Sequence, residues 1–315
     1  MENIGVSIVC NTYNQENYIA KALDSFLMQK VDFKYEILVH DDASTDGTAN
    51  IIREYEKKYP DIIKPIYQEV NQYDEIKGIS TRFQFPRAKG KYIAFCEGDD
   101  YWTDPLKLQK QYDYLEAHPE VDICTHGAVA IDAETEKIRY KIAPSKKSRI
   151  MPMEEVIWGD GVYVVSNSMV FRTEITHEIP EFWKQFGYQF CAKLRASIKG
   201  GMYYISDIMS VYRTMSKGSW SSKMKKDSNR WYKFNERKSN MFRMFDEYTN
   251  FKYTKIINKK IKYDNVILLI NTGKYKEAFA KENRKYFRLL PWKTRVYCFL
   301  KAYMPWCFKL MKKKG

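Results

Sequence analysis

Strand-like and helix-like segments alternate along the first part of the chain, and this alternation constrains the fold more than any other feature. Compact apolar runs typical of buried strands occur at 6–10, 35–40, 62–67 and 91–96. Between them, residues 15–30 and the stretch from Thr48 onwards have the apolar spacing of amphipathic helices. Such an order predicts βαβ units around a mostly parallel sheet, so the expected fold class is α/β.

The pattern changes after residue 120. Strand-like runs are expected at 121–132, 163–172 and 202–213, helices at 104–120 and 182–200, a Lys-rich loop at 134–150, and charged, mainly helical chain at 226–290. We therefore expect three parts, at 1–125, 126–225 and 226–315.

Polar clusters follow three of the first four strand-like runs. "NTYN" follows the first, "DDASTDG" the second and "EGDDYW" the fourth. In open α/β sheets, ligands bind outside the carboxyl ends of the strands. Each cluster alone is compatible with an ordinary capped loop, but all three together predict a single site at one edge of the sheet.

The third cluster is acidic, with Glu97, Asp99, Asp100 and Asp104 inside "AFCEGDDYWTD". Carboxylates at this density repel one another unless a cation lies among them. Mg²⁺ and Mn²⁺ prefer oxygen ligands and leave room for phosphate oxygens. Such an ion also accepts the charge that develops on a departing diphosphate. Glu97 and Asp99 occupy alternate positions of an extended segment and project to the same side, so one can approach the metal and the other the ribose or a metal-bound water.

Three segments, "VSIVCNTYNQENYIAKALDSFLMQ", "EILVHDDASTDGT" and "AKGKYIAFCEGDDYW", resemble the signature segments of family 2 glycosyltransferases in order, spacing and strand context. The resemblance covers roughly the first 125 residues strongly and residues 160–222 weakly. It implies the GT-A fold, in which a Rossmann-like mixed sheet flanked by helices binds a nucleotide sugar. Residues 1–125 would bind the donor and residues 126–225 the acceptor.

The resemblance also implies an activity. A hexosyl group would move, with inversion, from a nucleotide donor such as a UDP-sugar to a glycan or lipid-linked acceptor in cell-surface polysaccharide synthesis. Mn²⁺ or Mg²⁺ would be the cofactor, with Asp99 and Glu97 as its protein ligands. A catalytically weak nucleotide-sugar-binding protein in a membrane-associated assembly is the alternative hypothesis.

Donor-binding residues follow from the same resemblance. They are Thr12, Tyr13, Asn14, Asp41, Asp42, Arg82, Glu97 and Asp99. Asp42 would accept a hydrogen bond from the base, with Asp41 or Asp46 shaping the loop; for Asp46, capping of the following helix is the favoured alternative. Glu97 stands where the family usually has the first Asp of an Asp-x-Asp motif, and its longer side chain would change the metal geometry.

Four basic residues could steady the diphosphate, with simple solvation as the alternative. They are Arg82, Arg87, Arg213 and Lys217.

An inverting transferase needs a base that takes the proton from the acceptor hydroxyl. Family members usually supply an Asp just before a helix, but here that position falls on Tyr188 or Gln189. Three explanations remain open: a shifted alignment with Glu181 or Asp207 as the base, an acid from elsewhere such as Asp100, or donor binding without efficient transfer.

Three further positions carry open alternatives. Asp100 could instead contact the acceptor or brace its loop. Trp102 is either an acceptor platform or a packing residue. In the family a His often follows "VYR", but in this sequence that place falls near Met215 and no His is present there.

Positive charge is concentrated near the C-terminus. Residues 251–315 contain 18 Lys or Arg and three acids, whereas the first 250 residues contain 35 basic and 36 acidic side chains. Within 292–315, seven basic residues alternate with aromatic ones and no acid occurs. This segment suits an anionic membrane surface, with a packed terminal helix as the alternative. The neutral remainder argues against a nucleic-acid-binding protein.

Composition supports an intracellular setting. None of the six cysteines forms a C-x-x-C pair, so buried reduced thiols are expected. No apolar stretch approaches the roughly 18 residues of a membrane-spanning helix, and the apolar run at the N-terminus is too short for a signal peptide. The expected location is the cytoplasm, peripheral on the inner face of the cell membrane. The oligomeric state is not predicted.

Overall fold

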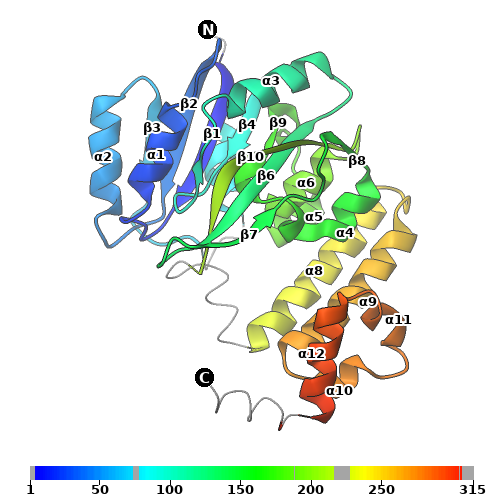
Figure 1. Ribbon diagram of the computed structural model, residues 1–315. Helices are drawn as coiled ribbons and strands as arrows, with labels where there is room; N and C mark the ends of the chain where they lie inside the picture. The colour runs from blue at the N-terminus through cyan, green and yellow to red at the C-terminus, as the bar shows by residue number, and fades with distance from the viewer. Residues whose placement is uncertain (1–3, 74–77, 188, 216–227, 305, 307–315) are drawn as a thin grey trace. The chain divides into compact units, whose positions relative to one another are not determined.

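The computed structural model describes residues 4–73, 78–187, 189–215, 228–304 and 306 (Figure 1). The chain divides into two compact units, Met1–Ser221 and Ser222–Gly315.

The first unit is built on one mixed sheet. Its strands are β1 Ile4–Thr12, β2 Lys34–Asp41, β3 Ile63–Tyr67, β4 Tyr92–Phe95, β5 Tyr101–Trp102, β6 Ile123–Asp132, β7 Ile138–Ile142, β8 Arg149–Met151, β9 Val170–Arg172 and β10 Met202–Thr214. The main order is β3-β2-β1-β4-β9-β6-β10-β5, with β7 beside β6 and β8 beside β10. Strands β3, β2, β1 and β4 are parallel, whereas β9 is antiparallel to both β4 and β6.

Helices flank this sheet (Figure 1). They are α1 Ile19–Leu27, α2 Thr48–Lys58, α3 Lys107–Ala117, α4 Met153–Tyr163, α5 Glu181–Phe186 and α6 Gln189–Ala196, with short helical turns η1 Ser80–Gln84, η2 Phe85–Arg87, η3 Ser166–Ser168 and η4 Thr173–Thr176. The expected α/β class and the four predicted strands of the first 125 residues are confirmed.

Alternation along β1 explains how the sheet is buried. Val6, Ile8 and Cys10 point to one face, where they share a core cluster with α1 residues such as Leu23 and Phe26. All five of these side chains are fully buried. The β1 strand is therefore fixed in register, and with it the position of the loop that follows Thr12.

Three predicted segments differ from the structure. The expected loop at 134–150 contains β7 and β8, and only 170–172 of the expected strand at 163–172 is extended sheet. The expected helix at 182–200 is interrupted at Gly187, whose φ of 76° ends α5 in the left-handed conformation that favours glycine. Short elements and a single turn residue carry too little periodicity to be recognised in advance.

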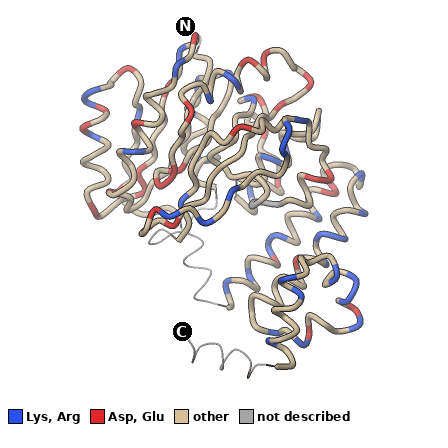
Figure 2. The backbone as a smooth tube through the Cα atoms, viewed as in Figure 1, with Lys and Arg blue, Asp and Glu red and all other residues tan. Residues whose placement is uncertain are grey.

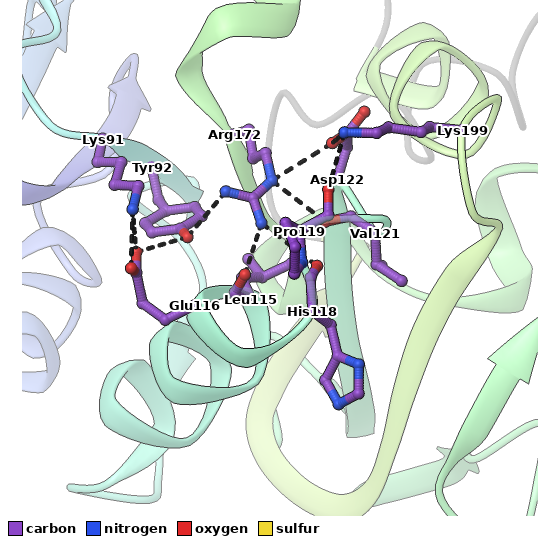
Figure 3. A network of polar contacts seen from close by, with 10 residues as sticks. All are labelled: Lys91, Tyr92, Leu115, Glu116, His118, Pro119, Val121, Asp122, Arg172 and Lys199. Atoms are coloured by element: carbon purple, nitrogen blue, oxygen red, sulfur yellow. Dashed lines mark hydrogen bonds and ion pairs between the residues drawn. The ribbon is translucent and has the colours of Figure 1, made fainter.

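Arg172 fastens α3 to the sheet (Figure 3). Its guanidinium donates to the carbonyl oxygens of Leu115 and His118, at the C-terminal end of α3, and to the hydroxyl of Tyr92 on β4. It also lies 3.3 Å from a carboxylate oxygen of Asp122. A cation at this end of a helix satisfies its last carbonyls and complements its dipole.

The second unit is helical. Its helices are α8 Ser228–Tyr248, α9 Thr254–Asn271, α10 Tyr275–Ala278, α11 Arg284–Phe287 and α12 Trp292–Tyr303. Val266, Ala278, Phe287, Leu290 and Cys298 form a core cluster within it. None of the helices that the described residues form is both long enough and apolar enough to cross a bilayer.

Cysteine chemistry agrees with the prediction where the structure describes it. Cys10, Cys96, Cys124, Cys191 and Cys298 are buried free thiols. Cys307 lies outside the described residues.

Candidate active site

The ends of β1, β2 and β4 bring the three polar clusters together. The amide of Asp42 donates to the carbonyl of Thr12 at 3.0 Å, and the amide of Gly98 donates to the carbonyl of Asn11 at 3.0 Å. A Cβ on Gly98 would lie 2.9 Å from the Cβ of Thr12, so this close approach requires glycine. The predicted meeting of the clusters at one sheet edge is therefore present in the fold.

The first cluster forms a tight turn after β1. The Thr12 hydroxyl donates to the side chain of Gln15 at 2.7 Å, and Tyr13 is largely exposed. Asn14 has a φ of 53°, and its side-chain oxygen accepts from the amide of Thr45 at 2.8 Å. The turn thus presents an exposed aromatic ring beside the second cluster.

The two aspartates at the end of β2 differ in their hydrogen bonds. The Asp42 carboxylate accepts from the amides of Gln72 at 2.8 Å and Tyr73 at 3.1 Å, so it braces the loop after β3. One Asp41 oxygen accepts from Ser44, whereas the other is buried and has no hydrogen-bond partner among the described residues. The unused acceptor therefore lies on Asp41, whereas sequence reasoning put the base contact on Asp42.

Asp46 contacts the start of α2. Its carboxylate accepts from the amide of Thr48 at 2.9 Å and from the amide of Glu16 at 3.2 Å. These contacts favour the helix-capping alternative.

Glu97 is held from the other half of the unit. It accepts from Gln189 Nε2 at 2.8 Å and from the hydroxyl of Ser166 at 3.2 Å. Burial, with the nearby Asp99 carboxylate as a second cause, raises the pKa of Glu97 to about 7. A carboxyl group in this state gains most from a neighbouring cation.

The donor set at this turn suits a hard cation that keeps other ligands. Glu97 and Asp99 supply carboxylate oxygens on either side of Gly98. Within the described ranges, no group of three or more His, Cys, Asp or Glu side chains forms a complete metal cage. Two carboxylates with remaining positions for phosphate oxygens and water are the mode in which Mg²⁺ usually binds.

Asp100 lies beneath the turn rather than at its surface. One oxygen accepts from the backbone amide of Arg213 at 2.8 Å and the other from Asn167 Nδ2 at 2.9 Å. The side chain is almost completely buried. Burial, with Asp99 and Glu97 as further causes, raises the pKa of Asp100 well above its usual value. These contacts favour the bracing alternative over a role as the base.

The region of the expected base is described at Gln189, whereas Tyr188 lies outside the described residues. The Gln189 amide donates to Glu97 and does not take up protons. Gly187 approaches Gly78, since a Cβ on Gly78 would lie 3.5 Å from the Gly187 Cα. Gly187 therefore lies close to Gly78, and Gln189 lies beside the acidic turn.

The two alternative bases contact other residues of the protein. Asp207 forms an ion pair of 2.8 Å with Lys110, six residues before Arg213 along β10. An extended chain rises roughly 3.3 Å per residue, so Asp207 is about 20 Å from the site end of the strand. Glu181 is exposed at the start of α5 and accepts from Gln185.

Trp102 is a core residue. It is buried, its ring lies 4.8 Å from that of Phe26, and its indole nitrogen donates to the carbonyl of Asn167 at 2.8 Å. These contacts favour packing over an acceptor platform.

The basic candidates differ in environment. Arg82 is exposed on η1 with its guanidinium 5.5 Å from the Phe83 ring, and Arg87 donates to the carbonyl of Lys64. Arg213 is buried below the acidic turn. Lys217 lies outside the described residues, and Met215 has a φ of 66°.

Sequence reasoning missed Ser166 and Asn167. Both lie in η3, where the polar triplet "SNS" interrupts an apolar run. That interruption was the available signal, because a buried strand rarely carries three consecutive polar side chains.

Comparisons with known proteins agree with this architecture. A family model described as "Glycosyl transferase family 2" matches residues 7–179. Among solved structures, the Staphylococcus aureus protein TarS (residues 1–349) in complex with UDP-GlcNAc has a TM-score of 0.54 at 16% identity, covering 95% of this chain and 87% of that one. A mannosyltransferase from Pyrobaculum calidifontis, in complex with GDP-Man and Mn²⁺, has a TM-score of 0.54 at 16% identity, covering 96% and 85%.

Curated relatives extend the comparison. An uncharacterised protein of Mycobacterium tuberculosis is 36% identical over 220 residues, covering 69% of this chain and 61% of the relative. A poly(ribitol-phosphate) beta-glucosyltransferase of Bacillus spizizenii is 38% identical over 227 residues, covering 64% of this chain and 32% of the relative. The chain thus spans less than two thirds of the length of these relatives.

The chain has the GT-A fold of these solved structures. The chain belongs to glycosyl transferase family 2, whose model matches more than half of its length.

Proposed function

We propose that this protein is a metal-dependent inverting glycosyltransferase. It moves a hexosyl group from a nucleotide donor, a UDP-sugar, to a glycan or lipid-linked acceptor in cell-surface polysaccharide synthesis. The carrying observation is the turn in which Glu97 and Asp99 lie side by side, with the pKa of Glu97 raised to about 7. Burial and mutual repulsion disfavour the charged form of Glu97, and a bound cation with its nucleotide would offset both effects.

The metal proposal assigns Asp99 and Glu97 as the protein ligands. When bound, Mn²⁺ or Mg²⁺ stabilises the negative charge of the leaving diphosphate. Gln189 and Ser166 orient Glu97 through the two hydrogen bonds to its carboxylate. Asp100 fixes the turn to β10 by accepting from the Arg213 amide, which limits the conformational freedom of the neighbouring Asp99.

Donor recognition is proposed at the ends of β1 and β2. The unused oxygen of Asp41 accepts the imide hydrogen of a uracil base, and Tyr13 and Asn14 border the base. Asp42 acts through the loop at 72–73, whose amides it binds. A nucleotide-sugar donor is supported by the complexes with UDP-GlcNAc and GDP-Man in two proteins of similar fold.

One observation favours the second candidate, a catalytically weak protein that binds nucleotide sugars. At the place where an acid is expected, Gln189 donates to Glu97, and both oxygens of Asp100 are used within the protein. Donor binding and turnover must therefore be measured separately.

The test begins with calorimetric titration of UDP in the presence and absence of Mn²⁺. Asp99→Asn should abolish the metal-dependent part of UDP binding, whereas Asp61→Asn, an exposed change in the turn before β3, should leave it intact. UDP release from UDP-glucose and UDP-GlcNAc is then followed with and without lipid-linked acceptors. Metal-dependent binding without acceptor-stimulated release would favour the second candidate, and absence of UDP binding both with and without Mn²⁺ would refute both.

A peripheral position on the inner face of the membrane is also proposed. On α12, Trp292, Val296, Phe299 and Tyr303 recur every three or four residues and are each 48% to 63% exposed. The first three border an open apolar hollow. Such aromatic side chains, at the level of lipid headgroups, are typical of interfacial helices.

The positive charge of the helical unit also supports binding to an anionic membrane surface. The helical unit, 222–315, contains 26 Lys or Arg and seven Asp or Glu. Figure 2 shows the tube of α8–α12 marked mainly by basic residues. Each cation near an anionic bilayer contributes about 1 kcal/mol. Sedimentation with phosphatidylglycerol vesicles, but not with phosphatidylcholine vesicles, is expected, and Trp292→Ser with Phe299→Ser should weaken it. Equal sedimentation of this double variant would contradict the proposal.

A further inference from the structure

Arg213 is a buried cation directly beneath the acidic turn. Its side chain is only 2% exposed, near the end of β10. One terminal nitrogen donates to the backbone carbonyl of Asp99 at 2.7 Å, and the other donates to Glu136 at 3.2 Å. Its own backbone amide donates to Asp100 at 2.8 Å. The same residue therefore holds two consecutive residues of the turn, one through its guanidinium and one through its backbone.

Two aromatic rings fix the plane of the guanidinium. Its central carbon lies 4.8 Å from the ring centroid of Tyr18, just before α1, and 4.9 Å from that of Tyr101 on β5. Lys21 lies 4.2 Å from the Tyr101 ring and 3.8 Å from Glu136. Cation–π contacts in a desolvated place are stronger than at a surface, so these rings restrict the side chain to one position.

The contacts of Arg213 argue against a direct contact between its guanidinium and the donor. Both terminal nitrogens are engaged by protein oxygens, and the remaining Nε is buried without a hydrogen-bond partner among the described residues. A guanidinium that grips a diphosphate needs terminal nitrogens that face the ligand. The earlier alternative, in which Arg213 steadies the diphosphate, is therefore not favoured by its contacts.

The hydrogen bond to the Asp99 carbonyl indicates how Arg213 acts on the turn. The orientation of a peptide group sets the direction of the side chains on either side of it, because only two backbone dihedrals per residue are free. Donation to this carbonyl therefore restricts the direction of the Asp99 carboxylate. The positive charge also offsets part of the repulsion between Asp99 and Glu97.

We propose that Arg213 is a positioning residue for the metal-binding turn. It holds Asp99 in the conformation that accepts the divalent cation of the donor complex, and it touches neither the cation nor the nucleotide. This inference rests on the proposed function, since it assigns Asp99 as the metal ligand.

The ion pair with Glu136 provides a matched control. Glu136 is 59% exposed, with a φ of 52°, in the turn between β6 and β7. Glu136→Gln removes the charge of this solvated partner and keeps a side-chain oxygen that can accept from Arg213. It also leaves the contact between Arg213 and the Asp99 carbonyl in place.

The experiment measures Mn²⁺ binding directly, by the loss of the free-ion signal in electron paramagnetic resonance, with saturating UDP. Arg213→Met should weaken Mn²⁺ binding about tenfold or more, as is typical for residues that orient metal ligands. Arg213→Lys keeps one donor but cannot reach both Asp99 and Glu136, so it should give a smaller loss. Glu136→Gln should change binding by less than about twofold.

Two further readouts separate positioning from general loss of structure. UDP binding without metal should be nearly unchanged in the Arg213 variants. Millimolar guanidinium should restore part of the Mn²⁺ binding of Arg213→Ala by occupying the space between the two rings. If Arg213→Met does not fold, the Mn²⁺ binding of Arg213→Lys still tests whether Arg213 positions the turn.

Two outcomes would overturn the inference in distinguishable ways. Parent-like Mn²⁺ binding in Arg213→Lys and in every folded Arg213 variant would refute positioning while the proposed function stands. Failure of the parent protein itself to bind Mn²⁺ with UDP would refute the proposed function, and this inference with it.

Discussion

Replacement of Arg172 by Met tests whether the polar network of Figure 3 stabilises the first unit. The guanidinium side chain is 11% exposed and donates to four oxygens, which belong to Val121, Tyr92, Leu115 and His118. Methionine retains much of the aliphatic packing and removes every donor. The change therefore isolates the hydrogen bonds from the volume of the side chain.

The magnitude follows from the groups left behind. Three backbone carbonyls and one hydroxyl lose their donor, at roughly 1 kcal/mol each after partial rehydration. Asp122 also loses the cation 3.3 Å away. Asp122 keeps a second cation, because Lys199 Nζ lies 3.9 Å from its carboxylate, so this loss adds little to the four hydrogen bonds. We expect the free energy of unfolding of this unit to fall by about 4 kcal/mol.

Two matched variants test the reasoning. Lys91→Met removes a cation of the same network whose pair with Glu116 is half exposed, so the expected cost is below about 1 kcal/mol. Asp122→Asn removes a charge from a carboxyl whose pKa burial already raises, so a loss of only about 1 kcal/mol is expected.

Urea unfolding followed by circular dichroism gives the total change, and hydrogen exchange of α3 and β9 peptides gives its location. A loss below about 1 kcal/mol for Arg172→Met, or no larger than for Lys91→Met, would refute the account.

The remaining predictions concern the acidic turn and the helical unit. In the metal-free protein, folding holds a proton on Glu97 up to about pH 7, against an unperturbed pKa of 4.5, so stability should fall as pH rises between these values; chemical unfolding at pH 5 and pH 8 should show this fall, and Glu97→Gln should reduce it. Gly98→Ala would place a methyl group 2.6 Å from a glutamine oxygen, so a loss of about 1–3 kcal/mol and of metal-dependent UDP binding is expected in calorimetry; parent-like values would contradict the close approach. Asp264→Asn would remove a buried negative charge that lies 2.9 Å from Lys238 Nζ and 2.8 Å from Lys260 Nζ; thermal unfolding should show a loss of about 3 kcal/mol, and an unchanged transition would be incompatible with this buried triad.

Much of residues 1–125 could be predicted because the signals there are local and repeated. Each of β1, β2 and β4 is a short apolar run followed at once by polar residues, and parallel strands bring these ends to one edge. The positions of Thr12, Asp41 and Asp99 follow from that rule alone.

The remaining features depend on partners distant in sequence. Asn167 contacts Asp100 across 67 residues, and Arg213 contacts Asp99 across 114. The periodicity of apolar residues along a sequence does not predict such long-range pairs. The difference between Asp41 and Asp42 was equally hidden, because it arises from the loop at 72–73 that donates to only one of them.

The hydrogen bonds from the amides of Gln72 and Tyr73 to the Asp42 carboxylate have a consequence for engineering this end of the sheet. The end of β2 and the loop after β3 share these hydrogen bonds, so neither can be exchanged alone without leaving a carboxylate or two amides unsatisfied. Chimeras with related transferases should therefore transplant 41–42 and 71–73 as one block, even though 28 residues separate them in the chain.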